Sequence, residues 1–397
     1  MTRREVGKGT AYPANVLAGD GVVYIVAGWG KAHPYEGFAT IPMSGKVMHA
    51  PRQPKCSYSG SPGAYDMYAL DIALNSEERS VFMNPNVTFS LRKEFGWTFV
   101  SPASGKSECH IADVSAGNLS VLTIGPQDTI WGAGAASPYL WRFSADGSAA
   151  NFALPKGVTA FDSLVEGPDH VIWAQPENTQ LVMRISPGSG RVLNRFKVPC
   201  PRPAHALAVV SGFVWGYADA CVFAILPSGV ANAYSVTGLV AEDSPHAIAA
   251  GPDGNPWFIQ RAPGSAAAIA TLDRDSKKAT FVALPSGASD ALALGTGPDR
   301  NLWVTDANDD LYTYVPNPLS VDPPSVTIPQ VRDVARLTVT EHGTSRWRAS
   351  SANTSVARIR KTSTPDVFAV TATGSGKTKL TIEDTVGNSV VVPVTVF

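Results

Sequence analysis

Short apolar runs separated by turn residues repeat along the first three quarters of the chain. In the clearer units two runs flank a turn that contains Gly-Pro, as residues 246–250 and 257–260 flank GPDGNP. A third run such as LVMRIS or CVFAIL follows, and a fourth ends in NFALP, RFKVP or FVALP. Because proline fixes φ at about −65° and the next residues tolerate tight turns, each such turn closes a hairpin. The pattern predicts four short antiparallel strands per unit.

A tryptophan marks the second run of each clear unit and gives the repeat its period. Successive tryptophans are 42 residues apart three times and 46 residues apart once, and they are Trp131, Trp173, Trp215, Trp257 and Trp303. A Gly-Pro pair begins six residues before four of them, whereas the unit of Trp215 reads VVSGFVW. Four strands in a repeat of this length are typical of a β-propeller blade. One blade cannot bury both faces of its sheet, so blades must stack around a common axis.

Two degenerate units precede the clear ones, which predicts seven blades. YPANVLAGDGVVYIVAG carries Tyr24 in place of the tryptophan, and MYALDIALNSEERSVFM carries Phe82. An insertion in residues 25–66 lengthens the gap between these two aromatics to 58 residues. The last unit ends at Val315 after three strands, and REVGKGTAYP resembles the FVALPSGASD segment that closes blade six. We therefore expect the N-terminus to supply the missing strand and so remove the exposed edges of an open ring.

The C-terminal part of the chain has a different pattern. Residues 317–326 (NPLSVDPPSV) are rich in proline and predict a linker of limited flexibility. Beyond them, segments such as VARLTVT, VFAVTATG and KTKLTIED alternate apolar and polar residues with short turns between them. Such alternation predicts a β-sandwich. The expected organisation is all-β, with a seven-bladed propeller in residues 1–316, the linker, and an Ig-like sandwich in residues 327–397.

Composition supports this fold class and restricts the partners. Glycine (35 residues) and proline (31 residues) are abundant, and 44% of the chain is hydrophobic, which suits an all-β protein with a core. The net charge is −1 and no long basic run occurs, so we expect no nucleic-acid partner. We also expect no membrane span and no signal peptide in this chain, because it has no long apolar run and MTRREVGKGT has no apolar core.

Four cysteines leave two interpretations open. Cys200 and Cys221 are close enough in sequence to staple one blade, and Cys56 could pair with Cys109. An even number of cysteines fits two disulfides formed in an oxidising space. The alternative is that all four are buried free thiols.

Polar side chains recur at the start of the innermost strand of each blade. They stand 10 to 13 residues before the blade aromatic, at the strand end opposite the Gly-Pro turn. Asn15, nine residues before Tyr24, is the candidate equivalent in blade one. The members are Asp71, Ser120, Asp162, His205, His246 and Asp290, and we add Gln260, at the end of a neighbouring strand, to the predicted ligand-binding rim. Carboxylates and neutral imidazoles around a channel could bind a divalent cation, Mg²⁺ or Ca²⁺, or a polar ligand. The alternative is that these side chains only solvate a water-filled channel.

Two stretches of sequence resemble known families. GPDGNPWFIQ, GPDRNLWVTD, FVALP and SPHAIAAGPDG resemble the streptogramin (virginiamycin B) lyases, well over residues 115–315 and weakly over residues 1–114. That resemblance implies a seven-bladed propeller and a Mg²⁺-dependent β-elimination, by a histidine and a glutamate, that opens a cyclic depsipeptide. The C-terminal segment from RWRASS to VVVPVTV resembles bacterial Ig-like (group 2) domains, which are common on bacterial surface proteins and phage virion proteins.

The sequence departs from the lyase pattern where the family carries glutamate, three residues after the blade aromatic. The residues at these positions are Gly134, Pro176, Ala218, Gln260 and Asp306. General acid–base catalysis needs a positioned proton acceptor, and a metal needs several converging oxygens. His246 with Asp306 is therefore the remaining catalytic candidate, with Gln260 near it, and we expect the lyase chemistry to be lost.

Two functions follow as hypotheses. The first is a non-enzymatic recognition or structural protein on a phage virion or bacterial surface, with the propeller as a platform and the Ig-like domain as an attachment module. Its partners would be other chains of an assembly, or a surface glycan or protein. The rival is a metal-dependent lyase acting on a cyclic peptide or a polysaccharide. A divalent ion bound at the rim of polar residues would favour the lyase.

Overall fold

The computed structural model describes the two ends of the chain in different detail. Up to residue 118 it describes the backbone of the strands, in residues 2–5, 13–19, 22–27, 38–42, 48–49, 55–57, 64–66, 72–74, 80–89, 92–100 and 107–112. From residue 119 it describes side chains except those of residues 120, 135–137, 145, 219–220, 235–246, 261–267, 274–275, 287, 289–292, 298–300, 307–310, 317–318, 341–347, 365 and 384–388.

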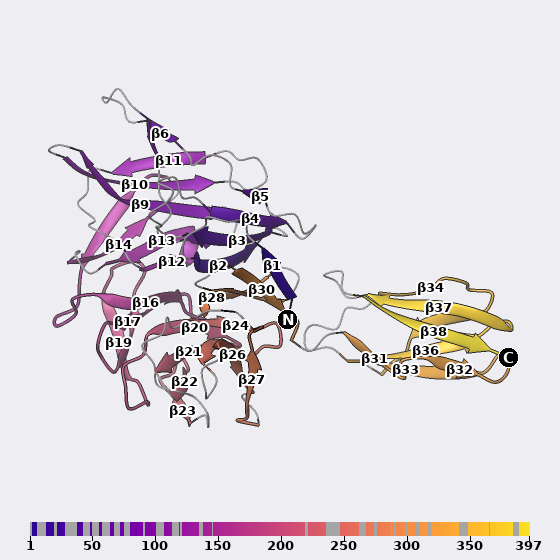
Figure 1. Cartoon of the computed structure of the whole chain (residues 1–397). Helices are drawn as coiled ribbons and strands as arrows, with labels where there is room; N and C mark the ends of the chain where they lie inside the picture. Colours follow the sequence, from indigo (N-terminus) through magenta and orange to yellow (C-terminus); the bar gives the residue numbers. More distant parts are fainter. Residues whose placement is uncertain are drawn as a thin grey trace. The chain divides into compact units, whose positions relative to one another are not determined.

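The first part of the chain forms seven four-stranded antiparallel sheets, the blades of a propeller (Figure 1). Blade one is β2 (Pro13–Gly19), β3 (Val22–Ala27), β4 (Phe38–Pro42) and β5 (Met48–His49). Blade two is β8 (Ile72–Leu74), β9 (Ser80–Phe89), β10 (Arg92–Val100) and β11 (Ser107–Ala112). Blade three is β12 (Val121–Gly125), β13 (Thr129–Ala133), β14 (Tyr139–Phe143) and β15 (Ala149–Ala153), with a 3-10 turn, η1 (Pro126–Asp128), in its first hairpin.

The remaining blades repeat this order. Blade four is β16 (Phe161–Glu166), β17 (Ile172–Pro176), β18 (Leu181–Ile185) and β19 (Val192–Lys197). Blade five is β20 (Ala206–Val210), β21 (Phe213–Ala218), β22 (Cys221–Ile225) and β23 (Ala231–Ser235). Blade six is β24 (Ile248–Ala250), β25 (Pro256–Arg261), β26 (Ala267–Leu272) and β27 (Ala279–Ala283). Blade seven is β28 (Ala291–Thr296), β29 (Leu302–Asp306) and β30 (Asp310–Tyr314), completed by β1 (Thr2–Glu5).

The ring is closed by the N-terminal strand, as the sequence predicts. β1 pairs antiparallel with β30, with Thr2 opposite Thr313 and Glu5 opposite Asp310. The innermost strands contact one another in the order β2, β8, β12, β16, β20, β24 and β28, and β28 contacts β2 again. A strand from the start of the chain thus covers the edge that blade seven would otherwise expose.

The predicted insertion lies between blades one and two. It contains a separate two-stranded sheet of β6 (Lys55–Ser57) and β7 (Ala64–Asp66), which joins none of the blades. In the described part of the chain, no helix has the length and apolar character needed to cross a bilayer.

The repeated tryptophans are the centres of the packing between blades. Trp131, Trp173 and Trp303 are completely buried. Trp131 stacks on Phe152 of the outermost strand of its own blade, and Trp173 stacks on Phe196 in the same way. Trp131 also belongs to a core shared with residues of blade four, and Trp173 to one shared with blade five. The period that is visible in the sequence is therefore the period of the core.

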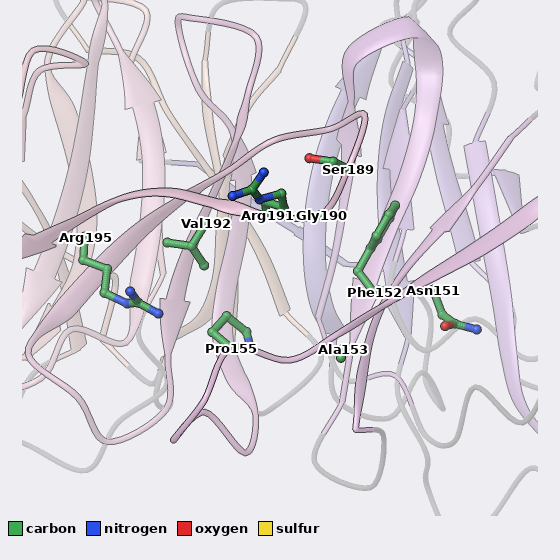
Figure 2. A pocket seen from close by; sticks show the side chains of 9 residues that line it. All are labelled: Asn151, Phe152, Ala153, Pro155, Ser189, Gly190, Arg191, Val192 and Arg195. Carbon is green, nitrogen blue, oxygen red and sulfur yellow. The ribbon is translucent and has the colours of Figure 1, made fainter.

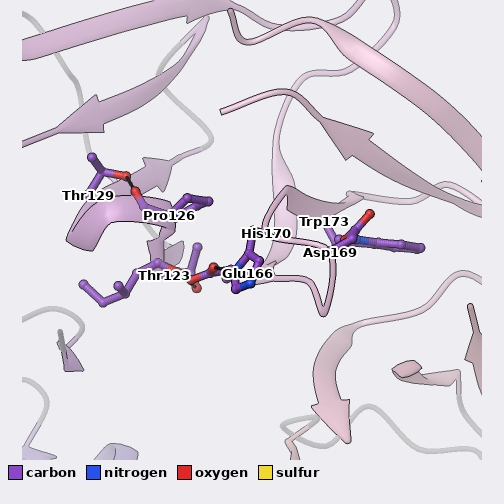
Figure 3. Close-up of polar contacts among 8 residues, drawn as sticks. Thr123, Pro126, Thr129, Glu166, Asp169, His170 and Trp173 are labelled. Atoms are coloured by element: carbon purple, nitrogen blue, oxygen red, sulfur yellow. Dashed lines mark hydrogen bonds and ion pairs between the residues drawn. The ribbon is translucent and has the colours of Figure 1, made fainter. Parts of the chain in front are cut away.

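Nearby residues in the sequence accept a hydrogen bond from the indole N–H of two of these tryptophans, and Figure 3 shows the pair in blade four. In blade four, Asp169 of the GPDH turn accepts a hydrogen bond from Trp173 Nε1 at 2.9 Å and also pairs with Arg184. In blade three, Thr129 Oγ1 accepts from Trp131 Nε1 at 3.1 Å. Blade five has the shorter turn Ser-Gly instead, and Trp215 Nε1 is buried with no hydrogen-bond partner among the residues that the structure describes. In blade four the Gly-Pro-Asp turn thus satisfies a buried donor as well as reversing the chain.

Replacing Asp169 by alanine is expected to lower the free energy of unfolding by about 2 kcal/mol, because a buried indole donor and a guanidinium lose their acceptor together. Asp169→Asn keeps an acceptor for Trp173 and should cost less. Urea unfolding followed by tryptophan fluorescence measures both variants. Equal losses for the two variants would show that the indole hydrogen bond contributes little.

One of the two predicted disulfides is present in the described residues. Cys200 and Cys221 are bonded, with Cα atoms 5.9 Å apart, and both side chains are buried. The bond ties the segment that follows β19 to the first residue of β22, so it links blades four and five. The side chains of Cys56 and Cys109 lie outside the described residues, and their pairing stays a prediction.

Residues from Val315 onward form a second compact unit. One sheet has the order β31 (Ser320–Asp322), β33 (Val334–Thr340), β36 (Val367–Ala372) and β35 (Ala357–Lys361). The other has the order β32 (Val326–Ile328), β38 (Ser389–Val396), β37 (Gly376–Glu383) and β34 (Arg348–Ser351). Leu337 of the first sheet and Leu380 of the second belong to one shared core. That this unit is Ig-like stays a prediction.

Part of the range predicted as a linker is in strands. β31 pairs with β33, and β32 pairs in parallel with β38. Val326 is buried in the core of the second unit and Val321 packs against it. The prolines between these valines dominate the sequence pattern, although the apolar residues around them are what the sheets bury.

Candidate ligand-binding rim

Two of the predicted polar residues occupy the same position in neighbouring blades. Trp173 pairs with Val165, three residues after Asp162, and Trp215 pairs with Ala208, three residues after His205. Both side chains are half-buried at the start of an innermost strand. We call Asp162, His205 and their neighbour Glu177 the blade 4–5 rim.

The other predicted positions follow this spacing to different extents. Trp131 pairs with Thr123 and Trp257 with Ala249, so Ser120 and His246 stand three residues before these partners in the sequence. Asp290 stands five residues before Gly295, the partner of Trp303. The side chains of Asn15, Asp71, Ser120, His246 and Asp290 lie outside the described residues, so their part in the rim stays a prediction.

The three groups of the blade 4–5 rim interact electrostatically. Burial raises the pKa of the Asp162 carboxyl above its ordinary value of 3.8. The nearby His205 imidazole lowers this pKa and the nearby Glu177 carboxylate raises it, both by less than burial does. A carboxyl of raised pKa beside an imidazole and a second carboxylate can hold or release a proton and can accept hydrogen bonds from a polar ligand.

Glu177 is the rim residue that sequence reasoning missed. It stands four residues after Trp173, one beyond the position at which the lyase family carries glutamate. The pairing of β16 with β17 shifts by one residue at Asp162, because Phe161 lies opposite Pro176 while Ser163 lies opposite Gln175. The backbone N–H of Glu177 donates to the carbonyl of Ala160 at 3.0 Å, which holds the exposed glutamate at the end of this irregular pair.

Two hydrogen bonds, one between the innermost strands and one within blade five, hold the residues around Asp162 and His205 in place. Ser163 Oγ accepts a hydrogen bond from the backbone N–H of Leu207 at 3.0 Å, which ties blade four to blade five. The backbone N–H of His205 donates to the carbonyl of Tyr217 at 3.2 Å. The residues next to Asp162 and at His205 are thus held in place by the sheet itself.

The strand-end positions that carry glutamate in the lyase family are part of the core here. Gln260 is 4% exposed and accepts a hydrogen bond from the Tyr217 hydroxyl at 2.5 Å. Asp306 is 0% exposed and accepts from the Tyr312 hydroxyl at 3.2 Å. Pro176 and Ala218 are buried as well and have no side-chain group that could transfer a proton. These residues have structural contacts in the blades.

The divalent cation expected at the rim stays a prediction. Among the side chains that the structure describes, no group of three histidine, cysteine, aspartate or glutamate residues is placed to hold a metal ion. The predicted candidates His246, Asp290 and Asp71 are not among them.

Asparagine in place of Asp162 is expected to change how stability depends on pH. Because the folded chain binds the proton of Asp162 more tightly than the unfolded chain, this group makes its full contribution to stability below the ordinary pKa of 3.8. That contribution is lost as the pH rises through the raised pKa of the folded state. Asp162→Asn should therefore gain stability relative to the wild type as the pH rises through the acid range. Urea unfolding of both proteins tests this, and parallel pH profiles would contradict it.

Comparison with known proteins supports the fold. No protein-family model and no curated protein matches the sequence. Virginiamycin B lyase from Staphylococcus aureus is similar in structure, with a TM-score of 0.60, 17% identity, and coverage of 79% of this chain and 97% of that one. A catalytically inactive variant of that lyase with quinupristin gives a TM-score of 0.59 at 17% identity, covering 78% and 97%.

The propeller is also similar to one from another class of protein. The WD40 β-propeller domain of Doa1 has a TM-score of 0.55 and 12% identity, with coverage of 78% of this chain and 96% of that domain. The identities to the lyase and to the WD40 domain are both low enough that the likeness is one of fold. The chain contains a β-propeller similar in architecture to the streptogramin B lyases and to WD40 domains.

Proposed function

We propose that this chain is a non-enzymatic recognition or structural protein of a phage virion or a bacterial surface. The propeller is the binding platform, and the second unit, as an Ig-like domain, attaches it to the larger assembly. The observation that carries this proposal is the burial of Gln260 and Asp306, which are engaged by Tyr217 and Tyr312 at positions where the lyase family has glutamate.

Two further features support the proposal, one for ligand recognition and one for a location outside the cytosol. The blade 4–5 rim presents carboxylates and an imidazole that suit hydrogen bonding to a polar ligand. The Cys200–Cys221 disulfide suits an oxidising space, where such bonds persist. The propeller fold serves enzymes and scaffolds alike, so the fold alone does not decide between them.

The rival function, a lyase, has one specific argument in its favour. Asp162 has a raised pKa and interacts with His205, and an acid beside an imidazole is an arrangement that can transfer protons. In this alternative the blade 4–5 rim, together with His246 and Asp306, would act on a cyclic peptide or a polysaccharide with a divalent cation.

An activity assay separates the two functions. Quinupristin is incubated with the protein and Mg²⁺, and mass spectrometry follows opening of the ring, with Staphylococcus aureus virginiamycin B lyase as the positive control. The proposal predicts no opening above the rate without protein. Opening that is lost in Asp162→Asn or Asp306→Asn would establish the lyase instead.

A second measurement tests the location. An antibody against this chain should label the outside of purified virions or of intact cells of the source organism in immunogold electron microscopy. Disrupted particles or cells provide the matched sample in which internal sites become accessible. Labelling only after disruption would contradict the proposed surface role.

A further inference from the structure

An open groove between the outer strands of blades three and four is unlike the blade 4–5 rim in its chemistry (Figure 2). It has a volume of about 510 Å³, within the size range of small-molecule sites. β15 supplies Phe152 on one side, and β19 with the turn before it supplies Ser189, Arg191 and Arg195 on the other. Among the residues that the structure describes, the lining contains two arginines and no acidic residue. We call it the blade 3–4 groove.

The groove is positively charged, and no described acidic residue forms an ion pair with its arginines. Arg191 and Arg195 are exposed, and neither guanidinium forms an ion pair or a hydrogen bond with a residue that the structure describes. Lys197 lies two residues beyond Arg195 in β19, on the same face of the strand, and Lys156 directly follows Pro155 of the lining; both are exposed. In a chain of net charge −1, this concentration of cations favours an anionic ligand.

The turn that carries Arg191 is fixed from both blades. The backbone N–H of Ser186 donates to the carbonyl of Arg191 at 2.9 Å, and that of Gly190 donates to the carbonyl of Ser186 at 2.9 Å. Arg142 of blade three donates through Nη1 to the carbonyl of Pro187 at 2.8 Å. The groove is therefore shaped before a ligand arrives, which lowers the entropic cost of binding.

Gly190 shows how tightly the turn packs on blade three. It has a φ of +66°, and a Cβ atom on it would lie 2.1 Å from the Phe152 ring. That ring in turn stacks on Trp131 and lies beneath the Arg142 guanidinium. A side chain at position 190 would push the turn, and Arg191 with it, away from the groove.

We infer that the blade 3–4 groove binds a sugar unit that carries an oxyanion, either a carboxylate or a phosphate. The planar guanidiniums of Arg191 and Arg195 match the geometry of both oxyanions. Ser189 offers a hydroxyl, which suits the hydroxyl groups of a sugar, and Val192 offers an apolar contact. This inference rests on the proposed recognition function and gives it a ligand class.

Isothermal titration calorimetry on the full chain tests the inference. The probes are digalacturonate and glucose 6-phosphate, and the neutral controls are the methyl ester of digalacturonate and glucose. At least one anionic probe should bind, about tenfold or more tightly than its neutral control. Arg191→Glu and Arg195→Glu should each weaken binding by about tenfold or more, the scale of a lost charge-assisted hydrogen bond. Lys278→Glu, an exposed change of equal charge in blade six, should leave it unchanged.

Three results would overturn the inference: no binding of either anionic probe, equal loss in Lys278→Glu and the arginine variants, or binding of inorganic phosphate as tight as that of the sugars. Circular dichroism and thermal unfolding establish that each exposed-site variant is folded. Because ring opening and surface labelling are measured separately, failure here would leave the proposed function standing. Ring opening of quinupristin would contradict the proposed function. The titrations would still decide whether the groove binds an anionic sugar.

Discussion

Removal of residues 1–5 is expected to cost the propeller on the order of 4 kcal/mol, because four residue pairs of the β1–β30 ladder are lost and each ladder hydrogen bond is worth about 1 kcal/mol. The loss also uncovers β30, whose Leu311 and Tyr312 are buried. An uncovered, apolar strand at the edge of a sheet is a template for aggregation. The truncated chain should therefore unfold at lower urea concentration and should aggregate at concentrations at which the wild type does not.

A peptide added in trans supplies the control for this truncation. A synthetic peptide of residues 1–8 can occupy the vacant edge and should restore much of the stability, whereas a scrambled peptide of the same composition should not. The second unit has its own core and should unfold as before, so its transition serves as an internal reference. An unchanged urea midpoint for the propeller after truncation would show that β1 contributes little to the closure of the ring.

The architecture could be predicted because the residues that repeat in the sequence are the buried residues of the core. A tryptophan that must stack on the outer strand of its own blade and pack against the next blade recurs at the blade period, so Trp131, Trp173 and Trp215 reveal the blades. The similarity of the N-terminal segment to the strand that closes blade six was sufficient to predict β1. The linker was harder to predict, since Pro323 and Pro324, which stand between β31 and β32, suggest a break in structure.

The rim could be predicted only in part. Asp162 and His205 were found because each begins an innermost strand at a fixed distance before its tryptophan. Glu177 was missed because the irregular pairing at Asp162 displaces the strand end by one residue, and a fixed count from Trp173 therefore arrives at Pro176. Sequence spacing follows regular strands and cannot follow a bulge whose position is set by local packing.

The blade 3–4 groove was not predictable from spacing at all. Asn151 and Arg195 belong to different blades, and only the stacking of the blades brings their outer strands together. The indole of Trp215, which has no hydrogen-bond partner among the described residues, follows the short Ser-Gly turn that stands in place of Gly-Pro-Asp. Contacts within one blade can thus be predicted from the sequence repeat, whereas sites between blades can be found only from the structure.

Loss of the Cys200–Cys221 bond should cost about 3 kcal/mol. The two residues are 21 positions apart, and closing a loop of that length in the unfolded chain gives a stabilisation of this size by the chain-entropy estimate. The bond joins the connection out of blade four to β22 of blade five, and both sulfurs are buried, so their replacement also loosens the packing around Phe223 and Val198. The double variant Cys200→Ala and Cys221→Ala should unfold at a clearly lower urea concentration than the oxidised wild type.

A reducing agent gives this experiment its matched control. Reduction should lower the urea midpoint of the wild-type propeller toward that of the double variant, and any reduction effect that remains in the variant comes from other cysteines. A double variant as stable as the oxidised wild type would contradict the expected contribution of the bond. The same titration in reducing buffer measures how far the stability of the propeller depends on the oxidised bond.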